Sequence, residues 1–407
     1  MTKITRASYA VLAACTITHF LNHVYTGAIS PFLPLIKDEL SLSLTQVGII
    51  TSAAIFTMTI THLAVGYLGD LGWRDVLIPL SVLLSALVVL FTSLATSFLF
   101  LVTMQALLGL GASGYHPSAF PAIADRFPRE ARAKAVGIQA MGGLVGMALI
   151  PFLGVMLLLL LGGWRESLMF LGAAGIAVFF VTALLMRSAR RTAVESQEEE
   201  EGDGEDGWTR DYVLSVILSG LRGIPFRCTN LLMPVYLVMS YGYTPVWAGS
   251  LTTLMLGTGL VAEVMSGPLS DRLGRRTPFI VLSPLLMAPC LLLLNSSLGP
   301  LPLALVLMGI GFFYYFGVPP YQAYQTEIAP KQSKGLAFGV LFSIGAIPGS
   351  LSPIVFGWIG DMYGLQASIL FLVSVSLLAT VVALLLREKP ASKKTTLHVG
   401  EASVEPL

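Results

Sequence analysis

The sequence predicts an all-α integral membrane protein in which twelve transmembrane helices form two pseudo-symmetric six-helix halves. Three observations support this fold class. Of the 407 residues, 55% are hydrophobic and only 12% are charged, whereas roughly 25% are charged in a typical soluble domain. Apolar runs of about 20 residues, long enough to cross a bilayer, recur along the whole chain. The sequence before a central acidic stretch also aligns with the sequence after it.

Short polar segments separate the predicted spans. The first span follows a short basic tail, MTKITRAS, and no small-residue cleavage site lies behind it. We therefore expect a retained helix and not a signal peptide. In chain order, the spans are predicted at approximately 8–30, 46–67, 76–96, 98–124, 136–158, 166–187, 212–240, 246–269, 278–297, 300–325, 336–357 and 367–387.

The distribution of basic residues predicts the orientation. If the N-terminus is cytoplasmic, twenty Lys and Arg residues lie in inner segments, and only Lys37 and Arg165 lie in outer loops. The positive-inside rule then predicts a multi-pass protein of the cell (plasma or inner) membrane with both termini cytoplasmic. Because the basic residues form no patch with interleaved aromatic residues, nucleic-acid binding is not expected.

An acidic segment divides the chain. The stretch RSARRTAVESQEEEEGDGEDGWTR has little apolar surface to bury and is expected to be a solvated linker. A regulatory or partner-binding segment is the alternative. The predicted organisation is an N-terminal six-helix half at 1–187, a cytoplasmic acidic linker at 188–210, a C-terminal six-helix half at 211–390 and a cytoplasmic tail at 391–407.

The two halves repeat one plan. The stretch GYLGDLGWR at 66–74 aligns with GPLSDRLGR at 267–275 when the chain is shifted by 201 residues, and glycines and a proline elsewhere align at 200 and 202. Three separate places thus give nearly one offset. A duplicated six-helix unit is the plan of many secondary transporters, whose substrate site lies between the halves.

One cytoplasmic joint carries a specific motif. The stretch SGPLSDRLGRRT at 266–277 resembles the signature loop of the major facilitator superfamily, G-x-x-x-D-R-x-G-R-R. The resemblance implies a latch that stabilises one of the alternating states. Its residues in this chain are Gly267, Asp271, Arg272, Gly274, Arg275 and Arg276, with a degraded copy at Gly66, Asp70 and Arg74.

Three stretches, at 18–50, 109–127 and 137–154, resemble the fosmidomycin-resistance branch of drug exporters within that superfamily. The pair His116-Pro117, which follows a Gly-x-Gly, is the closest part of this resemblance. It implies export by proton antiport. The chain departs from the pattern at Gln105, where many proton-driven members have an arginine, and in span five, where the antiporter signature lacks its proline.

Three charged residues lie deep inside predicted spans. Arg222 lies eleven residues past Asp211, roughly 16 Å along a helix, and Glu263 lies at a similar depth in span eight. Such charges are costly in a bilayer and mark functional sites by default. We hypothesise an Arg222–Glu263 pair that protonation of Glu263 would break, releasing the arginine for an anion. The alternatives are a static buried pair and no contact.

Arg227 follows five residues later and has no second acid available in the spans. Its guanidinium suits carboxylate, phosphonate or sulfonate oxygens, so we predict an anion contact. The alternative is an arginine that extends toward the outer headgroups. The residues expected to bind substrate are Arg222, Arg227, Asn22, Tyr25, Tyr314, Tyr321, Gln139 and Asn230.

Histidines are the second set of candidate proton carriers. His19 and His23 lie one turn apart in span one, and histidine titrates near physiological pH. His62 and His116 are interpreted as hydrogen-bonded packing residues. Two histidines at i and i+4 suit a metal ion, but without a third ligand none is assigned. No cofactor is expected.

The predicted function is a proton-coupled secondary transporter that moves a small organic anion or drug by alternating access, as an exporter. The alternative is a symporter that imports a small carboxylate or similar anion. A non-transporting membrane sensor is disfavoured because the chain has no sizeable soluble domain, and an enzyme because no nucleophile–base pair, nucleotide loop or metal set lies on a loop. The expected partners are the anion, protons and the lipid bilayer, and a monomer is expected.

Overall fold

The computed structural model describes residues 4–189, 208–330, 340–341 and 343–388. Most of the predicted linker, the predicted tail at 391–407 and the start of span eleven lie outside these residues. Within the described residues every regular element is helical, so the all-α fold class is confirmed. By length and composition, eight described helical segments are able to cross a membrane, and Thr277–Leu293 is shorter but apolar.

The N-terminal half holds the first six predicted spans. Span four consists of two helices, α5 and α6, because the chain turns at residues 113–115. The elements are α1 (Arg6–Gly27), η1 (Ser30–Phe32), α2 (Leu33–Glu39), α3 (Leu44–Leu68), η2 (Gly69–Trp73), α4 (Arg74–Thr92), α5 (Phe98–Ala112), α6 (His116–Ala124), α7 (Arg129–Leu161) and α8 (Trp164–Ala189).

The C-terminal half repeats this order, and span ten is likewise built from two helices. Its elements are α9 (Arg210–Tyr241), α10 (Pro245–Leu273), α11 (Thr277–Leu293), α12 (Pro300–Phe316), α13 (Val318–Ile328), α15 (Ile347–Tyr363) and α16 (Leu365–Leu384). The prediction of span eleven at 336–357 ends too early. Its described helix runs to Tyr363, where Gly364, with a φ of 86°, ends it.

Short polar residues and glycines set the helix ends. A hydroxyl oxygen accepts the main-chain N–H three residues later at five N-termini, as N-caps do, and these caps are Thr5, Ser43, Ser97, Thr209 and Thr244. Helices α7, α9 and α10 end at glycines with positive φ, a conformation that favours glycine, namely Gly162, Gly242 and Gly274.

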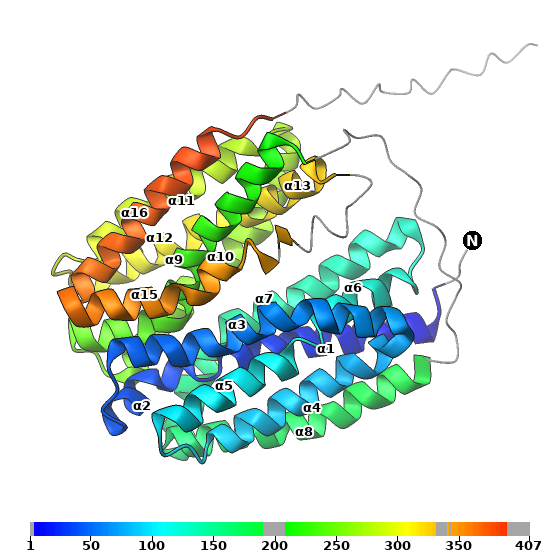
Figure 1. Cartoon of the computed structure of the whole chain (residues 1–407), viewed down its shortest axis with the longest axis horizontal. Helices are drawn as coiled ribbons and strands as arrows, with labels where there is room; N and C mark the ends of the chain where they lie inside the picture. The colour runs from blue at the N-terminus through cyan, green and yellow to red at the C-terminus, as the bar shows by residue number, and fades with distance from the viewer. Residues whose placement is uncertain (1–3, 190–207, 331–339, 342, 389–407) are drawn as a thin grey trace, which may run out of the picture.

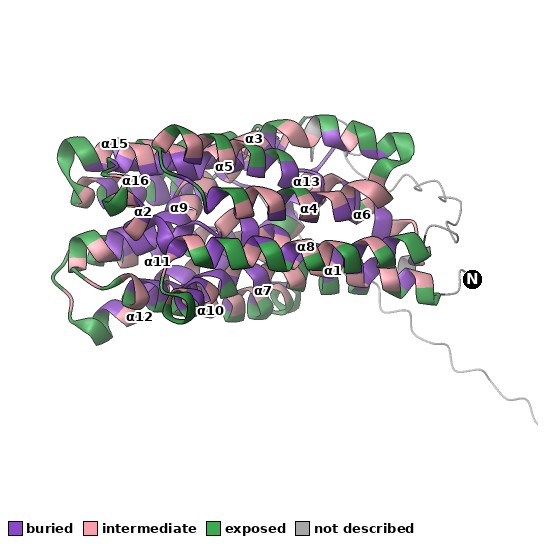
Figure 2. Cartoon of the chain, turned by 90° about the horizontal axis from the view of Figure 1, so that it is seen from below, coloured by how far each residue is buried: buried purple, intermediate pink, exposed green. Residues whose placement is uncertain are grey.

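The helices run side by side, and Figure 1 shows the two halves as separate groups, α1 to α8 below and α9 to α16 above. Buried residues lie inside the bundle and exposed residues line its outside (Figure 2). Many exposed residues are large and apolar, among them Leu99 (71% exposed), Leu160 (72%) and Leu301 (71%). A bilayer covers such side chains, since its core is as apolar as they are.

Contacts between the halves gather at one end. We name the end that carries the N-terminus the inner end and the opposite end the outer end. At the outer end, α3 packs on α15 and α7 packs on α10. Toward the inner end, the halves diverge in Figure 1. Among the described residues, every hydrogen bond between the halves involves an outer or central residue. The halves are therefore closed at the outer end and separate toward the inner end.

One carboxylate caps a helix across the outer interface. Asp361, near the end of α15, accepts hydrogen bonds from the main-chain N–H groups of Leu44 at 2.9 Å and Thr45 at 2.8 Å. The hydroxyl of Thr45 donates to it at 2.6 Å. These N–H groups begin α3, where the helix dipole favours a negative charge. Asp361 therefore joins the halves by an interaction that must break before the outer end can open.

We expect Asp361→Asn to weaken this closure, because the amide lacks the charge and has only one acceptor oxygen. The loss is about 1 kcal/mol at an exposed helix end, which raises the population of the outward-open state roughly fivefold. The measurement is the distance distribution between spin labels on Asp38→Cys and Met362→Cys, both exposed at the outer end, in protein without its native cysteines.

Glu39→Gln is the matched control. Glu39 lies at the same end but pairs with Arg165 of its own half at 2.7 Å. Hydrogen bonds from Arg165 and Trp164 hold the pKa of Glu39 below its ordinary value. This variant should leave the inter-half distances unchanged. If Asp361→Asn also leaves them unchanged, the contact does not hold the outer end closed.

Candidate functional site

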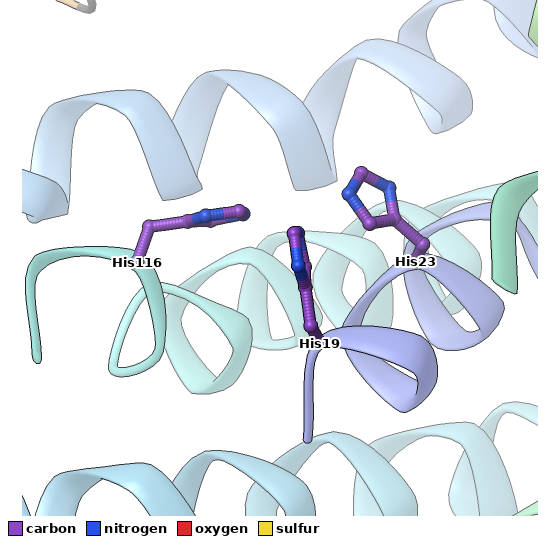
Figure 3. Close-up of side chains that lie close together, drawn as sticks. All are labelled: His19, His23 and His116. Carbon is purple, nitrogen blue, oxygen red and sulfur yellow. The ribbon is translucent and has the colours of Figure 1, made fainter. Parts of the chain in front are cut away.

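Four of the five histidines of the chain gather inside the N-terminal half. His19 and His23 lie one turn apart on α1, His116 begins α6 and His62 lies on α3. The ring centroid of His19 is 5.0 Å from that of His23 and 5.2 Å from that of His116. The His62 ring lies 5.9 Å from the His116 ring. Figure 3 shows His19, His23 and His116 turned toward one another.

A buried glutamine of α7 positions one member of this histidine cluster. Nδ1 of His19 lies 2.9 Å from the main-chain oxygen of Gln139 and 3.0 Å from its Nε2. Nε2 of Gln139 also donates to the Tyr115 hydroxyl. Gly143, one turn along α7, leaves room for the His19 ring, since a Cβ atom there would collide with it. The predicted role of Gln139 as a substrate contact stays a prediction.

The guanidinium of the first membrane-embedded arginine has its partners within the C-terminal half. Arg222 on α9 donates to Oγ of Ser283 on α11 at 3.2 Å and to the main-chain oxygen of Tyr314 on α12 at 3.5 Å. Its Cζ lies 5.5 Å and 5.2 Å from the ring centroids of Tyr314 and Tyr321, an attractive cation–π arrangement. Arg222 therefore ties three spans of one half together.

The hypothesised Arg222–Glu263 ion pair is absent, which corrects the sequence interpretation. Among the described residues, the Glu263 carboxylate forms no hydrogen bond or ion pair. Glu263 is half-buried on α10, which packs on α12, and it interacts electrostatically with Tyr314 and Tyr315. The two charges have similar depths and both lie near Tyr314, but no ion pair joins them.

The second membrane-embedded arginine lacks such hydrogen-bond partners among the described residues. The Cζ of Arg227 lies 5.1 Å from the Phe226 ring centroid, and within the described part of the chain its guanidinium has no hydrogen bond or ion pair. It is close enough to His23, His62 and His116 to interact electrostatically with them. Since these histidines belong to the other half, Arg227 is directed toward the N-terminal half.

An aromatic and amide layer lies beside Arg227. The Phe226 and Tyr314 rings stack with centroids 4.9 Å apart. Asn230, a predicted substrate contact, donates to the Tyr315 hydroxyl at 3.2 Å. Nδ2 of Asn230 and the hydroxyl of Tyr315 lie 3.7 Å and 3.5 Å from Sδ of Met147, which belongs to α7 of the other half. This layer joins the halves near the centre of the molecule.

Three predicted substrate contacts form hydrogen bonds to neighbouring helices, and their role in substrate binding stays a prediction. Asn22 donates to a main-chain oxygen of α5 at 2.9 Å, and Tyr25 donates to a main-chain oxygen of α8 at 3.3 Å. The Tyr321 hydroxyl accepts from Ser215 at 3.2 Å within the C-terminal half. All three side chains are buried. Their hydrogen-bonding groups are therefore occupied in this conformation.

The degraded signature loop forms an ion-pair cluster at the inner end of the N-terminal half. Arg74 lies 2.8 Å from Asp70 and 3.3 Å from Asp125. A second pair, Arg126 and Asp75, lies beside it at 2.9 Å. The cluster joins the ends of α3, α4 and α6 within one half.

The complete signature loop forms the corresponding cluster in the C-terminal half. Arg276 pairs with Asp271 and, at 3.3 Å, with Glu327. Gly274, with a φ of 62°, allows the turn between α10 and α11. Arg272 is exposed and forms no hydrogen bond or ion pair within the described ranges. Each cluster therefore stiffens its own half, and their predicted role as a latch stays a prediction.

The residues of the branch motif belong to helix packing as well as to the histidine cluster. Pro117 packs against Gly66, and Pro319 packs against Gly267 in the other half, so the two contacts repeat with the internal symmetry. Gln105 is buried in α5.

Sequence reasoning missed several residues of these clusters. Asp125 and Glu327 were detectable, because their offset of 202 matches that of the repeat. The others carry no signal in a single sequence. The missed residues are Asp75, Tyr115, Asp125, Arg126, Met147, Ser283, Tyr315, Glu327 and Asp361.

Sequence comparisons connect the chain with membrane transporters. A family model described as the Major Facilitator Superfamily matches residues 15–220 and 215–406. The probable sulfoacetate transporter SauU of Cupriavidus necator is 27% identical over 398 residues, which cover 89% of this chain and 90% of that protein. The D-galactonate transporter of Escherichia coli is 24% identical, and the match covers 94% of this chain and 96% of that protein. The fosmidomycin resistance protein of Escherichia coli is 25% identical and covers 88% of each chain.

The fold is also similar to solved structures. A bacterial homolog of the human lysosomal transporter Spinster, in an inward-facing and unoccupied conformation, has a TM-score of 0.78 at 20% identity, with 95% of this chain and 100% of that chain covered. Its inward-facing and occupied conformation has a TM-score of 0.76 at 19% identity, covering 94% and 97%. At this level of identity the likeness concerns the fold.

We expect Arg222→Lys to lower the melting temperature of the purified protein. An ammonium cannot reproduce the planar fork and ring stacking that Arg222 provides, and the lost hydrogen bonds correspond to about 1–3 kcal/mol. Arg227→Lys is the matched control, five residues along the same helix, because Arg227 has no described hydrogen bond to lose. Equal losses at both positions, or no loss at Arg222, would contradict the assignment of Arg222 to packing.

Proposed function

The chain belongs to the major facilitator superfamily, and on that premise we propose that it is a proton-coupled secondary transporter of a small organic anion. It is a multi-pass membrane transporter and not an enzyme. The substrate class, the proton coupling and the direction of transport form the proposal, and each is argued from particular residues.

Arg227 is the observation that carries the substrate class. A permanently charged guanidinium inside a membrane span is costly unless a partner balances it, and Arg227 lacks a described ion-pair partner. Arg222, by contrast, is satisfied inside its own half. An anion that enters from solution is the simplest partner for Arg227. Its position facing the other half fits a substrate site between halves.

The chemistry of the relatives supports the same class. Relatives are named for the transport of sulfoacetate and D-galactonate, both of which are small organic acids. A guanidinium binds carboxylate and sulfonate oxygens through paired hydrogen bonds. We therefore infer that the substrate carries at least one such group and that Arg227 binds it.

We assign the proton coupling to Glu263. Its carboxylate interacts electrostatically with Tyr314 and Tyr315, and Arg227 interacts with the same two tyrosines. An ionised Glu263 therefore disfavours an anion at Arg227, and protonation of Glu263 removes the repulsion. Proton and anion then favour each other's binding, and linkage makes this reciprocal. This sign of coupling favours symport.

Exchange of the anion for a proton is the second candidate. The resemblance to the fosmidomycin-resistance branch supports it, as does the relative named for fosmidomycin resistance. In exchange, protonation must weaken the binding of the anion. In the arrangement proposed for Glu263 and Arg227, protonation strengthens it. His19 and His23 stay predicted alternative carriers and have no part in the main proposal.

We expect Arg227→Ala to reduce the flux of the anion at least thirtyfold, since loss of one partner of a desolvated charge pair costs about 2 kcal/mol or more. The measurement is uptake of sulfoacetate into proteoliposomes, with D-galactonate and fosmidomycin tested in parallel. Sulfoacetate is suitable because its sulfonate stays ionised and the ion does not cross lipid unaided.

Arg187→Ala, at the exposed inner end of α8, is the matched control and should transport normally. Normal flux by Arg227→Ala would remove Arg227 from the substrate site. Failure of the wild-type protein to move any of the three anions would contradict the substrate class.

We expect wild-type uptake of sulfoacetate to acidify the liposome interior when no pH gradient is imposed and K⁺ with valinomycin dissipates the membrane potential. Glu263→Gln should still move sulfoacetate but without the pH change, because its amide cannot exchange a proton. A pH-sensitive dye inside the liposomes reports the proton movement.

Glu166→Gln, the same change at an exposed acid of α8, should acidify as the wild type does. Alkalinisation by the wild type would identify exchange. An unchanged pH signal from Glu263→Gln would remove Glu263 from the coupling.

A further inference from the structure

The histidine cluster is not used by the proposed anion and proton sites, and its composition is that of a metal site. The side chains of His19, His23 and His116 each offer a nitrogen, and these three nitrogens lie within 4.8 Å of one another. Figure 3 shows the three rings converging from α1 and α6. We propose that these three histidines bind a divalent transition-metal ion of the zinc class.

The geometry needs only local adjustment to hold such an ion. Zn–N bonds of about 2.0–2.1 Å in a tetrahedral site bring ligand nitrogens to roughly 3.3 Å from one another. His23 and His116 are half-buried and their rings can rotate, whereas His19 is buried and held. The i and i+4 spacing of His19 and His23 already directs both rings to one side of α1.

A second observation concerns the groups around the ligands. Metal-binding histidines commonly donate their other ring nitrogen to a main-chain carbonyl, which fixes the tautomer. Nδ1 of His19 lies 2.9 Å from the main-chain oxygen of Gln139, so donation there leaves Nε2 unprotonated. Nε2 of His62, next to His116, is buried without a hydrogen-bond partner in the described part of the chain. His62 lies outside the set of three converging nitrogens, so it would have to move toward His116 to become a fourth ligand.

The donor set selects the class of metal. Imidazole nitrogens suit Zn²⁺, Cu²⁺ and Ni²⁺, whereas Mg²⁺ and Ca²⁺ require oxygen ligands. The cluster contains no carboxylate, and the positive charge of Arg227 acts on His23 and His116. Both features weaken the site relative to a structural zinc site, so we expect micromolar affinity. A hydroxide or anionic ligand would offset the charge at a position left open.

All three ligands belong to the N-terminal half. A bound ion therefore moves with that half and does not bridge the two halves. Metal binding can consequently be measured without reference to transport, and its failure would leave the anion proposal intact.

The test is isothermal titration of Zn²⁺ into the full-length protein, purified through a tag that contains no histidine. We expect one ion per chain and at least tenfold weaker binding in each of His19→Gln, His23→Gln and His116→Gln, since even residues behind the ligands change affinity about 10–100-fold. Co²⁺ provides an independent spectroscopic signal, because tetrahedral nitrogen coordination gives strong visible absorption.

His398→Gln, at the remaining histidine of the chain, is the matched control and should bind as the wild type does. Size-exclusion profile and helical circular dichroism establish that each variant is folded. No binding by the wild-type protein would overturn the proposal. Binding that survives all three cluster substitutions, or that is lost only in His398→Gln, would overturn it as well.

Discussion

The cost of burying charge inside a bilayer is the constraint on which the rest of this structure depends. Two arginines lie on one helix, five residues apart, and their surroundings differ. Arg222 is enclosed by a hydroxyl, a carbonyl and two tyrosine rings of its own half. Arg227 has an aromatic neighbour and no described counterion. A charge that the fold leaves unbalanced at this cost is the strongest sign of a ligand that arrives from outside.

The internal repeat makes each half a rigid unit. Helices α3 and α5 approach so closely that a Cβ atom at Gly109 would collide with the carbonyl of Ala54, and Gly311 meets Met255 in the same way in the other half. Ion-pair clusters at the inner ends stiffen both units. By contrast, the described polar contacts between the halves are few and lie at the outer end or near the centre. Motion of one unit against the other is thus easier than deformation within either.

Sequence reasoning predicted the fold well because its signals are local. Hydropathy gives the spans, and the repeat gives the two halves. The orientation that the basic residues indicate stays a prediction. It also found the depth of Arg222, Arg227 and Glu263, since depth follows from counting residues along a helix. It could not predict which neighbour each helix face meets.

That limit explains the specific errors. Arg222 donates a hydrogen bond to Ser283, 61 residues away, and forms no pair with Glu263. Which side chains meet depends on the rotation of α9, α10 and α11 about their axes, and one sequence does not give that rotation. Likewise, His116 joins His19 through the turn that breaks span four, and an apolar run does not reveal such a turn. Span eleven was placed too early because Gly364, which ends its helix, resembles any other glycine in the sequence.

The placement of α9 connects the anion site proposed at Arg227 with the contact that closes the outer end. Pro225 lies between the two arginines and cannot donate a main-chain hydrogen bond, so α9 bends most easily there while Arg222 stays anchored. Next to this point, Gly223 packs directly on Gly349 of α15. The same helix carries Asp361, which caps α3 of the other half. A shift of α9 toward a bound anion therefore displaces the helix whose far end holds the halves together.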